Sequence, residues 1–320
     1  MWKSFNILTC LCNECPRLTN MNIMKMIAPL ILALIGCPRL TAADSGYLES
    51  IEAWHQHRVQ SLTRPDGWLS LSGLFWLKQG ENSFGSDLSN DIRFPQEKCD
   101  PFIGIFLLQG DSVEMVIRPE VDVRNQGQTV QRLRLRSDQG GSPTVLIHHS
   151  LSWHIIYRDG RFAVRLKDGE STALKGFRGI ERFPVDEKWA IEAVFIKSDS
   201  GSMLQVPTIL GSTSQEATPG LLEFIYEGQR YSLHVLGNEP DEDLFIVFGD
   251  AGNGEESYGG GRFLSVKRPD QEGRTIIDFN RAYNPPCAFT PYATCPLPPV
   301  GNMLPFKVTA GEKAYNQLHH

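Results

Sequence analysis

Short runs of apolar or alternating residues recur along this 320-residue chain from Trp68 onward, and turn-forming Gly, Asp and Asn residues separate them. Runs of this length and spacing are typical of strands in antiparallel sheets. Long helical patterns do not alternate with the runs, so a parallel sheet is not expected. The sequence predicts an all-β fold, an antiparallel β-sandwich packed on a second β-sandwich or small barrel, with one N-terminal helix. The expected strands cover residues 103–108, 112–117, 131–135, 144–147, 154–157, 162–166, 190–196, 203–206, 221–226, 229–236, 243–248, 261–266 and 274–279.

Local patterns predict several turns and the helix. Asp159-Gly160 and Glu227-Gly228 each separate two of the runs. Two-residue loops of this kind favour the tight turns of β-hairpins. Residues 47–62 carry apolar residues at helical spacing, with glutamates early and an arginine late, as the helix dipole prefers. We therefore expect the helix there.

The chain divides into three predicted parts. Residues 1–43 form an upstream extension and a signal peptide, and residues 44–175 form the helix and the first β-sandwich. Residues 176–320 form a second β domain that carries a loop rich in proline and cysteine. Charged and aromatic residues crowd the junction at 176–189, where they build either a polar pocket or a salt-bridge network between the domains.

The long apolar run at 26–36 follows Lys25 and is about half the length that a membrane-spanning helix needs. This pattern predicts a signal peptide, with Met21, Met24 and Met26 as alternative starts. Two exits compete. Cys37 ends a run that resembles a bacterial lipobox, which predicts a lipoprotein lipidated at Cys37. Residues 41–43 fit ordinary signal cleavage, which would leave Asp44 first. Either exit predicts an exported protein, periplasmic or anchored to the bacterial envelope.

The charge balance bears on the choice of partners. The formal net charge of -6 gives no electrostatic reason to expect nucleic acid, since a basic surface is needed to replace phosphate counterions. Contact with a membrane is expected only through the lipid anchor. The expected partner is a small molecule, a glycan or a peptide.

A segment rich in proline, asparagine and aromatic residues occupies positions 278–302. Its prolines exclude a helix or a central strand, so we expect an ordered surface loop, the kind of element that often carries function. Cys287 and Cys295 lie in this loop. In an oxidising compartment they form a disulfide; the alternative is two buried thiols that pack as small hydrophobic groups.

The loop 249–262 combines acidic residues with three consecutive glycines. Asp250, Asn253 and Glu255 offer the hard oxygen ligands that Ca²⁺ or Mg²⁺ prefers. Their spacing does not match an EF-hand loop, and a solvated acidic turn is the ordinary alternative. No cofactor is expected, with a divalent cation at these residues as the one alternative.

Residues 77–94 resemble the start of a forkhead-associated domain, a β-sandwich that reads phosphothreonine. The resemblance covers a glycine-rich entry and a strand that begins at Asn90-Asp91-Ile92. It implies a sandwich for the first half. Ser86 stands where those domains carry a phosphate-binding arginine, and their serine–histidine pattern is missing from 100–106. Phosphopeptide binding is therefore not implied.

The chain also resembles the bacterial family known as domain of unknown function 1684 (DUF1684). The resemblance runs from about residue 47 to residue 315, and its most specific block is Ala282-Tyr-Asn-Pro-Pro-Cys287. It implies a bacterial protein that often carries an export or lipoprotein signal, and it implies no particular activity. The other matching blocks cover residues 65–82, 179–184, 247–250, 258–264 and 310–313.

Two functions compete for this sequence. The first is a ligand-binding or scaffold module of the bacterial envelope, in which aromatic rings, amides and arginines grip a sugar or a peptide. Its predicted ligand-binding residues are Tyr258, Arg262, Arg281, Tyr283, Asn284 and Tyr292.

The second is a hydrolase with a polar or metal-assisted site between the two β units. Its candidate catalytic residues are Glu181, Arg182, Asp250, Asn280 and Asn284. If Asp250, Glu255 and Glu181 converge with Asn284 in one concave site, the hydrolase is favoured. If they scatter, the binding module is favoured.

Overall fold

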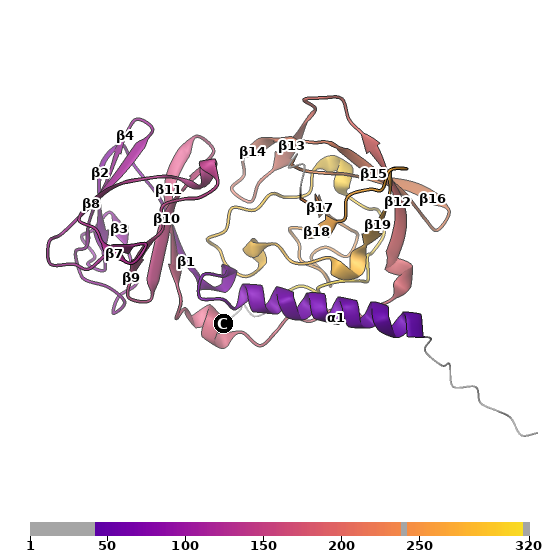
Figure 1. Ribbon diagram of the computed structural model, residues 1–320, viewed down its shortest axis with the longest axis horizontal. Coiled ribbons are helices and arrows are strands. Elements are labelled where there is room, and N and C mark those ends of the chain that lie inside the picture. The colour runs from indigo at the N-terminus through magenta and orange to yellow at the C-terminus, as the bar shows by residue number, and fades with distance from the viewer. Residues whose placement is uncertain (1–41, 238–241, 316–320) are drawn as a thin grey trace, which may run out of the picture. The chain divides into compact units, whose positions relative to one another are not determined.

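The computed structural model describes residues 42–237 and 242–315, and the residues from Ala42 onward belong to one compact unit. Most of its elements are strands that pair antiparallel, which confirms the all-β fold (Figure 1). The two-residue pairing of β3 (Ile92–Arg93) with β2 (Gly80–Gly85) is parallel. The sheets within the described residues are open, so the second half holds no closed barrel there.

A β-sandwich forms the first half of the unit. One sheet has the order β1-β11-β10-β9-β6-β7, and the other has the order β3-β2-β4-β5-β8. Phe84 and Phe106 of one sheet meet Trp153 of the other in the core, where the Phe84 and Trp153 ring centroids lie 5.8 Å apart. The remaining bounds are β1 Leu71–Trp76, β4 Gly104–Gln109, β5 Ser112–Ile117, β6 Arg124–Asn125, β7 Gln128–Thr129, β8 Arg132–Leu135, β9 Leu146–His148, β10 Leu151–Arg158 and β11 Arg161–Asp168.

The second half contains a four-stranded sheet and the pair β17–β18 around their own core, and a further hairpin, β13–β14, whose Val206 packs in a separate apolar cluster with Leu71. The sheet has the order β16-β15-β12-β19, and β13 pairs with β14 and β17 with β18. Trp189 and Phe279 lie in the core between these elements. The bounds are β12 Ala190–Lys197, β13 Met203–Pro207, β14 Thr213–Ala217, β15 Gly220–Tyr226, β16 Gln229–His234, β17 Leu244–Phe248, β18 Arg262–Val266 and β19 Arg274–Asp278.

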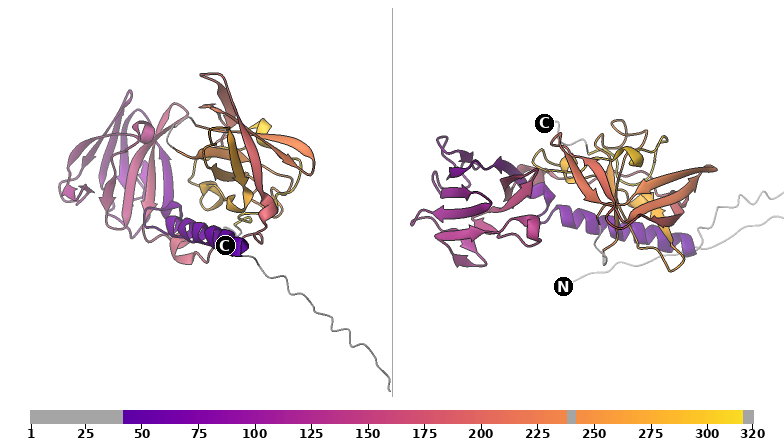
Figure 2. Two further views of the ribbon diagram at one scale, coloured as in Figure 1. Left: turned by 45° about the vertical axis from the view of Figure 1, so that its right-hand side comes forward. Right: turned by 90° about the horizontal axis from the view of Figure 1, so that it is seen from above.

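Helices are few in the described residues. The long helix α1 (Ala42–Leu62) confirms the prediction for 47–62 and begins five residues earlier. Figure 2 shows α1 as a single straight rod. The short helices are α2 (Thr172–Gly176) and the 3₁₀ turns η1 (Trp68–Ser70), η2 (Asp138–Gly140), η3 (Glu187–Trp189), η4 (Phe279–Arg281), η5 (Pro286–Ala288) and η6 (Val300–Asn302).

Both predicted hairpins are confirmed. Asp159-Gly160 joins β10 to β11, and Glu227-Gly228 joins β15 to β16. All four residues have positive φ, from +49° to +76°, as the mirror-image turns of two-residue hairpins require. The sequence interpretation missed β1, β2 and β14, which have weak or interrupted apolar alternation, and the two-residue strands β6 and β7.

The predicted signal sequence, its two cleavage sites and Cys37 lie outside the described residues. None of the described helices is long and apolar enough to span a bilayer.

Apolar and polar contacts tie the sandwich to the second half. Leu71 of β1 shares an apolar cluster with Val206 and Val247. Arg165 of β11 is buried and donates from Nη2 to Thr294 Oγ1 at 3.0 Å. Ser212 Oγ donates to the Asp159 carboxylate at 2.8 Å. The predicted domain boundary near 175 stays a prediction, because the described residues from both sides of it belong to one compact unit.

The charged residues of this seam also set a pH dependence. His154 of β10 lies opposite Arg165 of β11. Burial, followed by the charges of Arg165 and Lys167, lowers the pKa of His154 to about 4. A histidine in an unfolded chain takes up its proton near pH 6.5. Between these values the unfolded state binds more protons, so the free energy of unfolding falls as the pH falls through this window.

We expect His154→Gln to reduce the difference in unfolding free energy between pH 7 and pH 5. Urea unfolding at both pH values measures it. The matched control is His57→Gln, at an exposed position of α1. An equal pH dependence in wild type and His154→Gln would contradict the assignment.

Candidate functional site

The first residues of the proline-rich loop 278–302 form hydrogen bonds with helix α1. Tyr47 Oη donates to Asp278 Oδ1 at 2.8 Å, and Asn280 Nδ2 donates to Tyr47 Oη at 2.9 Å. Arg281 Nη2 donates to Ser50 Oγ at 3.1 Å. Asn280 also bonds both backbone groups of Asp186, so its amide is fully used inside the fold.

A buried ion pair docks the second half of α1. Arg58 donates to the Asn284 carbonyl at 2.8 Å and to Glu312 Oε1 at 3.3 Å, and its guanidinium lies 4.7 Å from the Tyr283 ring centre. The Asn284 N–H donates to Glu312 Oε2 at 2.7 Å. Burial raises the pKa of Glu312, and the charge of Arg58 offsets part of that rise. Four predicted site residues, Asn280, Arg281, Tyr283 and Asn284, thus hold the helix.

The sequence interpretation missed Arg58 and Glu312, the two charged ends of this contact. The signal for Glu312 was the block 310–313, in which Gly311 has φ +76°. A Cβ at Gly311 would lie 2.5 Å from the Ala282 carbonyl oxygen, so only glycine lets the two segments approach. No pattern within α1 singles out Arg58 from its other polar residues.

Asp250 and Arg262 form an ion pair in the interior. Their side chains are 1% and 0% exposed, and Arg262 Nη2 lies 2.8 Å from Asp250 Oδ2. The same guanidinium donates to the carbonyls of Val308, Ala310 and Glu312. Burial lowers the pKa of Arg262, and the Asp250 carboxylate opposes that shift. A ligand in solvent cannot reach either predicted site residue.

The three predicted metal ligands of the acidic loop do not converge. Asp250 faces Arg262, while the side-chain Oδ1 of Asn253 accepts from the Asp250 N–H at 2.7 Å. Glu255 is exposed and pairs with Lys307 at 2.6 Å. The structure thus gives this loop inward hydrogen bonds and one surface ion pair.

The candidate hydrolase residues also scatter. Glu181 is exposed, and Arg182 pairs with Glu52 of α1 at 2.8 Å. Asp250 is buried against Arg262, and Asn284 lies under α1. The geometric condition set for the hydrolase is not met, so the scattered arrangement favours the binding module.

Cys287 and Cys295 of the loop 278–302 pack on the apolar cluster of Val206 and Val247. Cys287 and Cys295 are thiols in the structure, and the Cys287 N–H donates to the Cys295 sulfur at 3.2 Å. Tyr258 Oη donates to the Cys287 carbonyl at 3.3 Å, and Tyr292 is exposed. The disulfide stays a prediction for oxidising conditions, in which the two neighbouring sulfurs would join.

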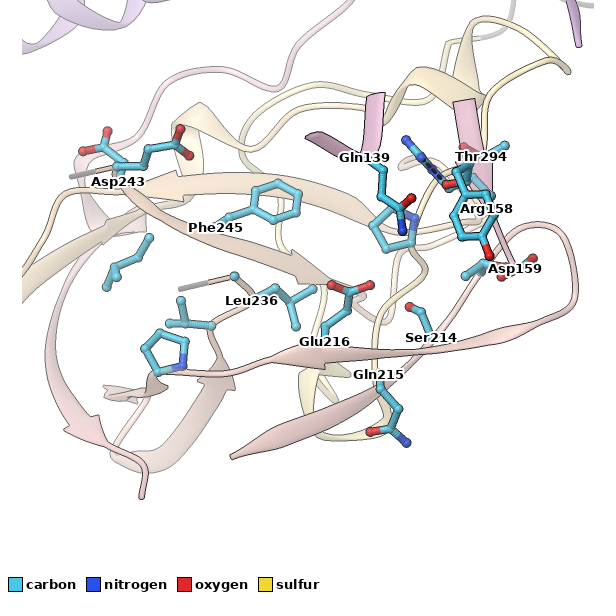
Figure 3. A pocket seen from close by; sticks show the side chains of 18 of the residues that line it. Gln139, Arg158, Asp159, Ser214, Gln215, Glu216, Leu236, Asp243, Phe245 and Thr294 are labelled. Carbon is cyan, nitrogen blue, oxygen red and sulfur yellow. Dashed lines mark hydrogen bonds between the residues drawn. The ribbon is translucent and has the colours of Figure 1, made fainter. Parts of the chain in front are cut away.

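A pocket of about 800 Å³ lies at the seam between the sandwich and the second half (Figure 3). Its volume falls within the usual range for small-molecule sites, about 300–1,000 Å³. Residues of β10, its hairpin turn and η2 line one side, and β14, β17 and the proline-rich loop line others. The lining includes Gln139, Tyr157, Arg158, Asp159, Thr208, Leu210, Ser214, Gln215, Glu216, Leu236, Asp243, Phe245, Arg268, Thr294 and Pro296.

Strand alternation sets which polar groups of β14 face the pocket. Ser214 and Glu216 are half-buried and Gln215 is exposed, so neighbouring side chains point to opposite faces. Figure 3 shows the Gln215 side chain directed away from Glu216 and Gln139. Among the described residues, the Glu216 carboxylate and the Gln139 amide have no hydrogen-bond partner and are available to a ligand.

Arg158 is already paired. Its Nη2 lies 2.7 Å from Asp138 Oδ2, and the backbone N–H of Tyr157 donates to the same carboxylate. Burial raises the pKa of Asp138. The hydrogen bond from Arg158 and its positive charge together lower that pKa by a larger amount, so the pKa of Asp138 lies below its usual value. Arg158 therefore contributes a neutralised ion pair to the pocket wall.

A second hollow, of about 1600 Å³, covers the outer face of the β16-β15-β12-β19 sheet and reaches Arg281. Exposed Val194, Ile225 and Ile276 lie in it. It is larger than an ordinary small-molecule site. The seam pocket is thus the better candidate for a small ligand.

A family match covers much of the second half. The family described as "Protein of unknown function (DUF1684)" matches residues 175–313. Residues 175–313 belong to this family. The DUF1684 region includes the Asp250–Arg262 pair, the loop that docks α1, and the pocket residues Glu216 and Thr294. Helix α1 and the sandwich precede it.

Solved structures similar to this DUF1684 chain include an uncharacterised protein of Haloarcula marismortui, determined by NMR. It is 30% identical, covers 46% of this chain and 80% of its own, and has a TM-score of 0.38. Two forkhead-associated domains, one from work on phosphothreonine-dependent interactions and one from a protein named FhaA, are each 12% identical. They cover 29% of this chain and 92% and 97% of theirs, with TM-scores of 0.21. No curated protein matches the chain.

The buried ion pair of the DUF1684 region gives a stability prediction. Arg262→Met leaves the Asp250 carboxylate buried without its partner, so we expect a loss of about 3–5 kcal/mol of unfolding free energy in urea titrations. The matched control is Arg274→Met, which removes an exposed ion pair with Asp270 and should cost much less. Equal losses in the two variants would contradict the structural role of Arg262. If Arg262→Met does not fold, Asp250→Asn measures the same pair.

Proposed function

We propose that this DUF1684 protein binds a small, neutral, hydroxyl-rich ligand such as a short glycan in the seam pocket. The observation that carries the proposal is the pocket itself, where unpartnered polar side chains from both halves of the unit converge beside apolar surface. Gln139 comes from the sandwich and Glu216 from the second half.

The lining suits hydroxyl groups. The Glu216 carboxylate accepts hydrogen bonds, and the Gln139 amide both donates and accepts. Phe245 and Leu236 lie on the same wall and offer apolar surface to the faces of a ring (Figure 3). Small-molecule sites combine apolar surface with a few placed polar groups in this way.

The charges of the lining disfavour an anion. Four lining residues are acidic, namely Asp159, Glu216, Glu242 and Asp243, and two are basic, namely Arg158 and Arg268. Arg158 is neutralised by Asp138, and Arg268 Nε donates to the Glu242 carbonyl at 2.7 Å. A neutral or cationic ligand is therefore preferred over a phosphate or a carboxylate.

The lining also favours binding over nucleophilic catalysis. Hydroxyl groups of Thr208, Ser214 and Thr294 are present, but the described lining contains no histidine or cysteine. A hydroxyl nucleophile needs a neighbouring base within hydrogen-bond reach. Thr208 Oγ1 instead bonds Ser212 Oγ at 2.6 Å, and Thr294 Oγ1 accepts from Arg165.

The pocket predicts a specific loss of binding. We expect neutral oligosaccharides to be recovered from a panel of neutral and acidic sugars and short peptides. In calorimetric titrations Glu216→Ala should bind the recovered sugar about 10-fold more weakly or worse, because a hydrogen bond to a charged group contributes about 1.5–3 kcal/mol. Gln139→Ala should bind it about 2- to 10-fold more weakly, because a hydrogen bond to a neutral amide contributes about 0.5–1.5 kcal/mol.

The matched control is Thr213→Ala, on the same strand β14 but exposed and outside the pocket lining. It should bind the sugar as the wild type does. Recovery of acidic sugars or peptides alone, or equal binding by Glu216→Ala and Thr213→Ala, would overturn the proposal.

We also propose that the protein acts outside the cytoplasm. The support comes from the signal-like run at 26–36 and its two exits. The docking contacts of Tyr47, Ser50 and Arg58 lie downstream of both cleavage positions, so removal of the leader preserves these hydrogen bonds.

Expression in a bacterium with fractionation tests this location. We expect the mature chain in the envelope or periplasmic fraction, starting at a lipid-modified Cys37 or at Asp44 by mass spectrometry. If Cys37 is the anchor, Cys37→Ser moves the protein out of the membrane fraction. A full-length chain that keeps its leader and stays in the cytoplasm would contradict export.

A further inference from the structure

Two histidines and a carboxylate meet on the sandwich, away from the seam pocket. His148 ends β9, His149 follows in the turn to β10, and Asp100 precedes β4. One ligand atom from each of the three side chains lies within 4.8 Å of the other two. His148 Nε2 is 3.2 Å from Asp100 Oδ2, and the two imidazole centres are 4.1 Å apart.

The hydrogen bonds of His148 determine which of its ring nitrogens faces Asp100. Its Nδ1 lies 3.0 Å from the backbone carbonyl oxygen of Asp122. A carbonyl oxygen only accepts, so Nδ1 carries the proton and the neutral ring presents the lone pair of Nε2. Metal-binding histidines are held in this way, with the second nitrogen bonded to a carbonyl or carboxylate.

That lone pair has no partner among the described residues. His148 is only 2% exposed, and its Nε2 is buried without a hydrogen bond. It faces the Asp100 carboxylate, another group with lone pairs. Two such groups at 3.2 Å repel unless a cation sits between them. The cation is either a proton on His148 or a metal ion.

The turn between β9 and β10 brings a second imidazole to this group. Residues 149–150 form a two-residue hairpin loop between the paired His148 and Leu151, and the φ of +54° at His149 is the conformation that such turns use. The loop places the centre of the His149 ring 4.1 Å from that of His148, which a simple ion pair between His148 and Asp100 does not need. The second imidazole therefore favours a metal ion over a proton.

We propose that Asp100, His148 and His149 bind one divalent transition-metal ion of the Zn²⁺ class, with a fourth position open to solvent. Two ligands about 2.0 Å from a tetrahedral ion lie about 3.3 Å apart, close to the separation of His148 Nε2 and Asp100 Oδ2. Asp100 and His149 are exposed, so their side chains can rotate inward and the ion can enter. Two imidazoles select Zn²⁺, Cu²⁺ or Ni²⁺ over Mg²⁺ and Ca²⁺, which prefer oxygen ligands.

Titration of the full chain with Zn²⁺ and Co²⁺ tests the site. We expect one saturable ion that Mg²⁺ and Ca²⁺ do not displace. Asp100→Ala and His149→Asn should each weaken it at least about 10-fold, since each removes a ligand. Asparagine tolerates the positive φ at 149, so that variant keeps the turn. Thermal unfolding without metal checks that both variants remain folded.

The matched control is the double variant His319→Ala, His320→Ala, which removes the other pair of adjacent histidines in the sequence. This double variant should bind Zn²⁺ with the same affinity as the wild type. Bound Co²⁺ should show the visible bands of a four-coordinate ion without a thiolate charge-transfer band, which would indicate the cysteines.

Three outcomes would overturn the proposal. The first is the absence of saturable binding. The second is a stoichiometry and affinity that Asp100→Ala leaves unchanged. The third is a thiolate signature for the bound ion. In the first case the cation between His148 and Asp100 is a proton.

Discussion

The guanidinium of Arg262 donates to three carbonyls and one carboxylate in a place that solvent does not reach. These bonds fix residues 308–312 against the acidic loop and so place Glu312. Glu312 in turn binds Arg58 and the Asn284 N–H, which holds helix α1 on the second half. A buried charge is costly unless it is paired and hydrogen-bonded, and the two Nη atoms of Arg262 make four such bonds, while its Nε has no partner among the described residues. The position of α1 thus depends on Arg262, which lies 200 residues after Leu62, the last residue of the helix.

The strands could be predicted where side-chain alternation alone decides burial. In β5, Ser112–Ile117, every second residue is buried, and its predicted bounds are the observed ones. In β14, Thr213–Ala217, the sequence Thr-Ser-Gln-Glu-Ala has no apolar alternation, and pairing with β13 makes it a strand. In β1, Gly73 interrupts the pattern, and the register with β11 shifts between Leu71 and Gly73. Tertiary pairing, which local sequence does not show, creates both of these strands.

The same limit applies to the predicted site residues. The loops 249–262 and 278–302 do carry ordered polar networks, as their composition indicated, but the networks point inward. Whether Asp250 faces solvent or a guanidinium depends on Arg262, whose own partners lie 46 to 50 residues further on. No role was predicted for His148 or His149 from the sequence. Asp100, which is remote from His148 and His149 in the sequence, reaches them only through the fold.

The location of the seam pocket links binding to the stability of the whole unit. Two polar contacts between side chains cross the seam, Arg165 to Thr294 and Ser212 to Asp159. Each involves a residue of the pocket lining, Thr294 in the first and Asp159 in the second. A ligand held by Gln139 and Glu216 would add further bonds across the same surface. Because such a ligand binds only the folded arrangement, it raises the free energy of unfolding in proportion to the logarithm of its concentration above the dissociation constant. The metal group on the sandwich shares no residue with this seam, so its ion stabilises the fold independently of the pocket's ligand.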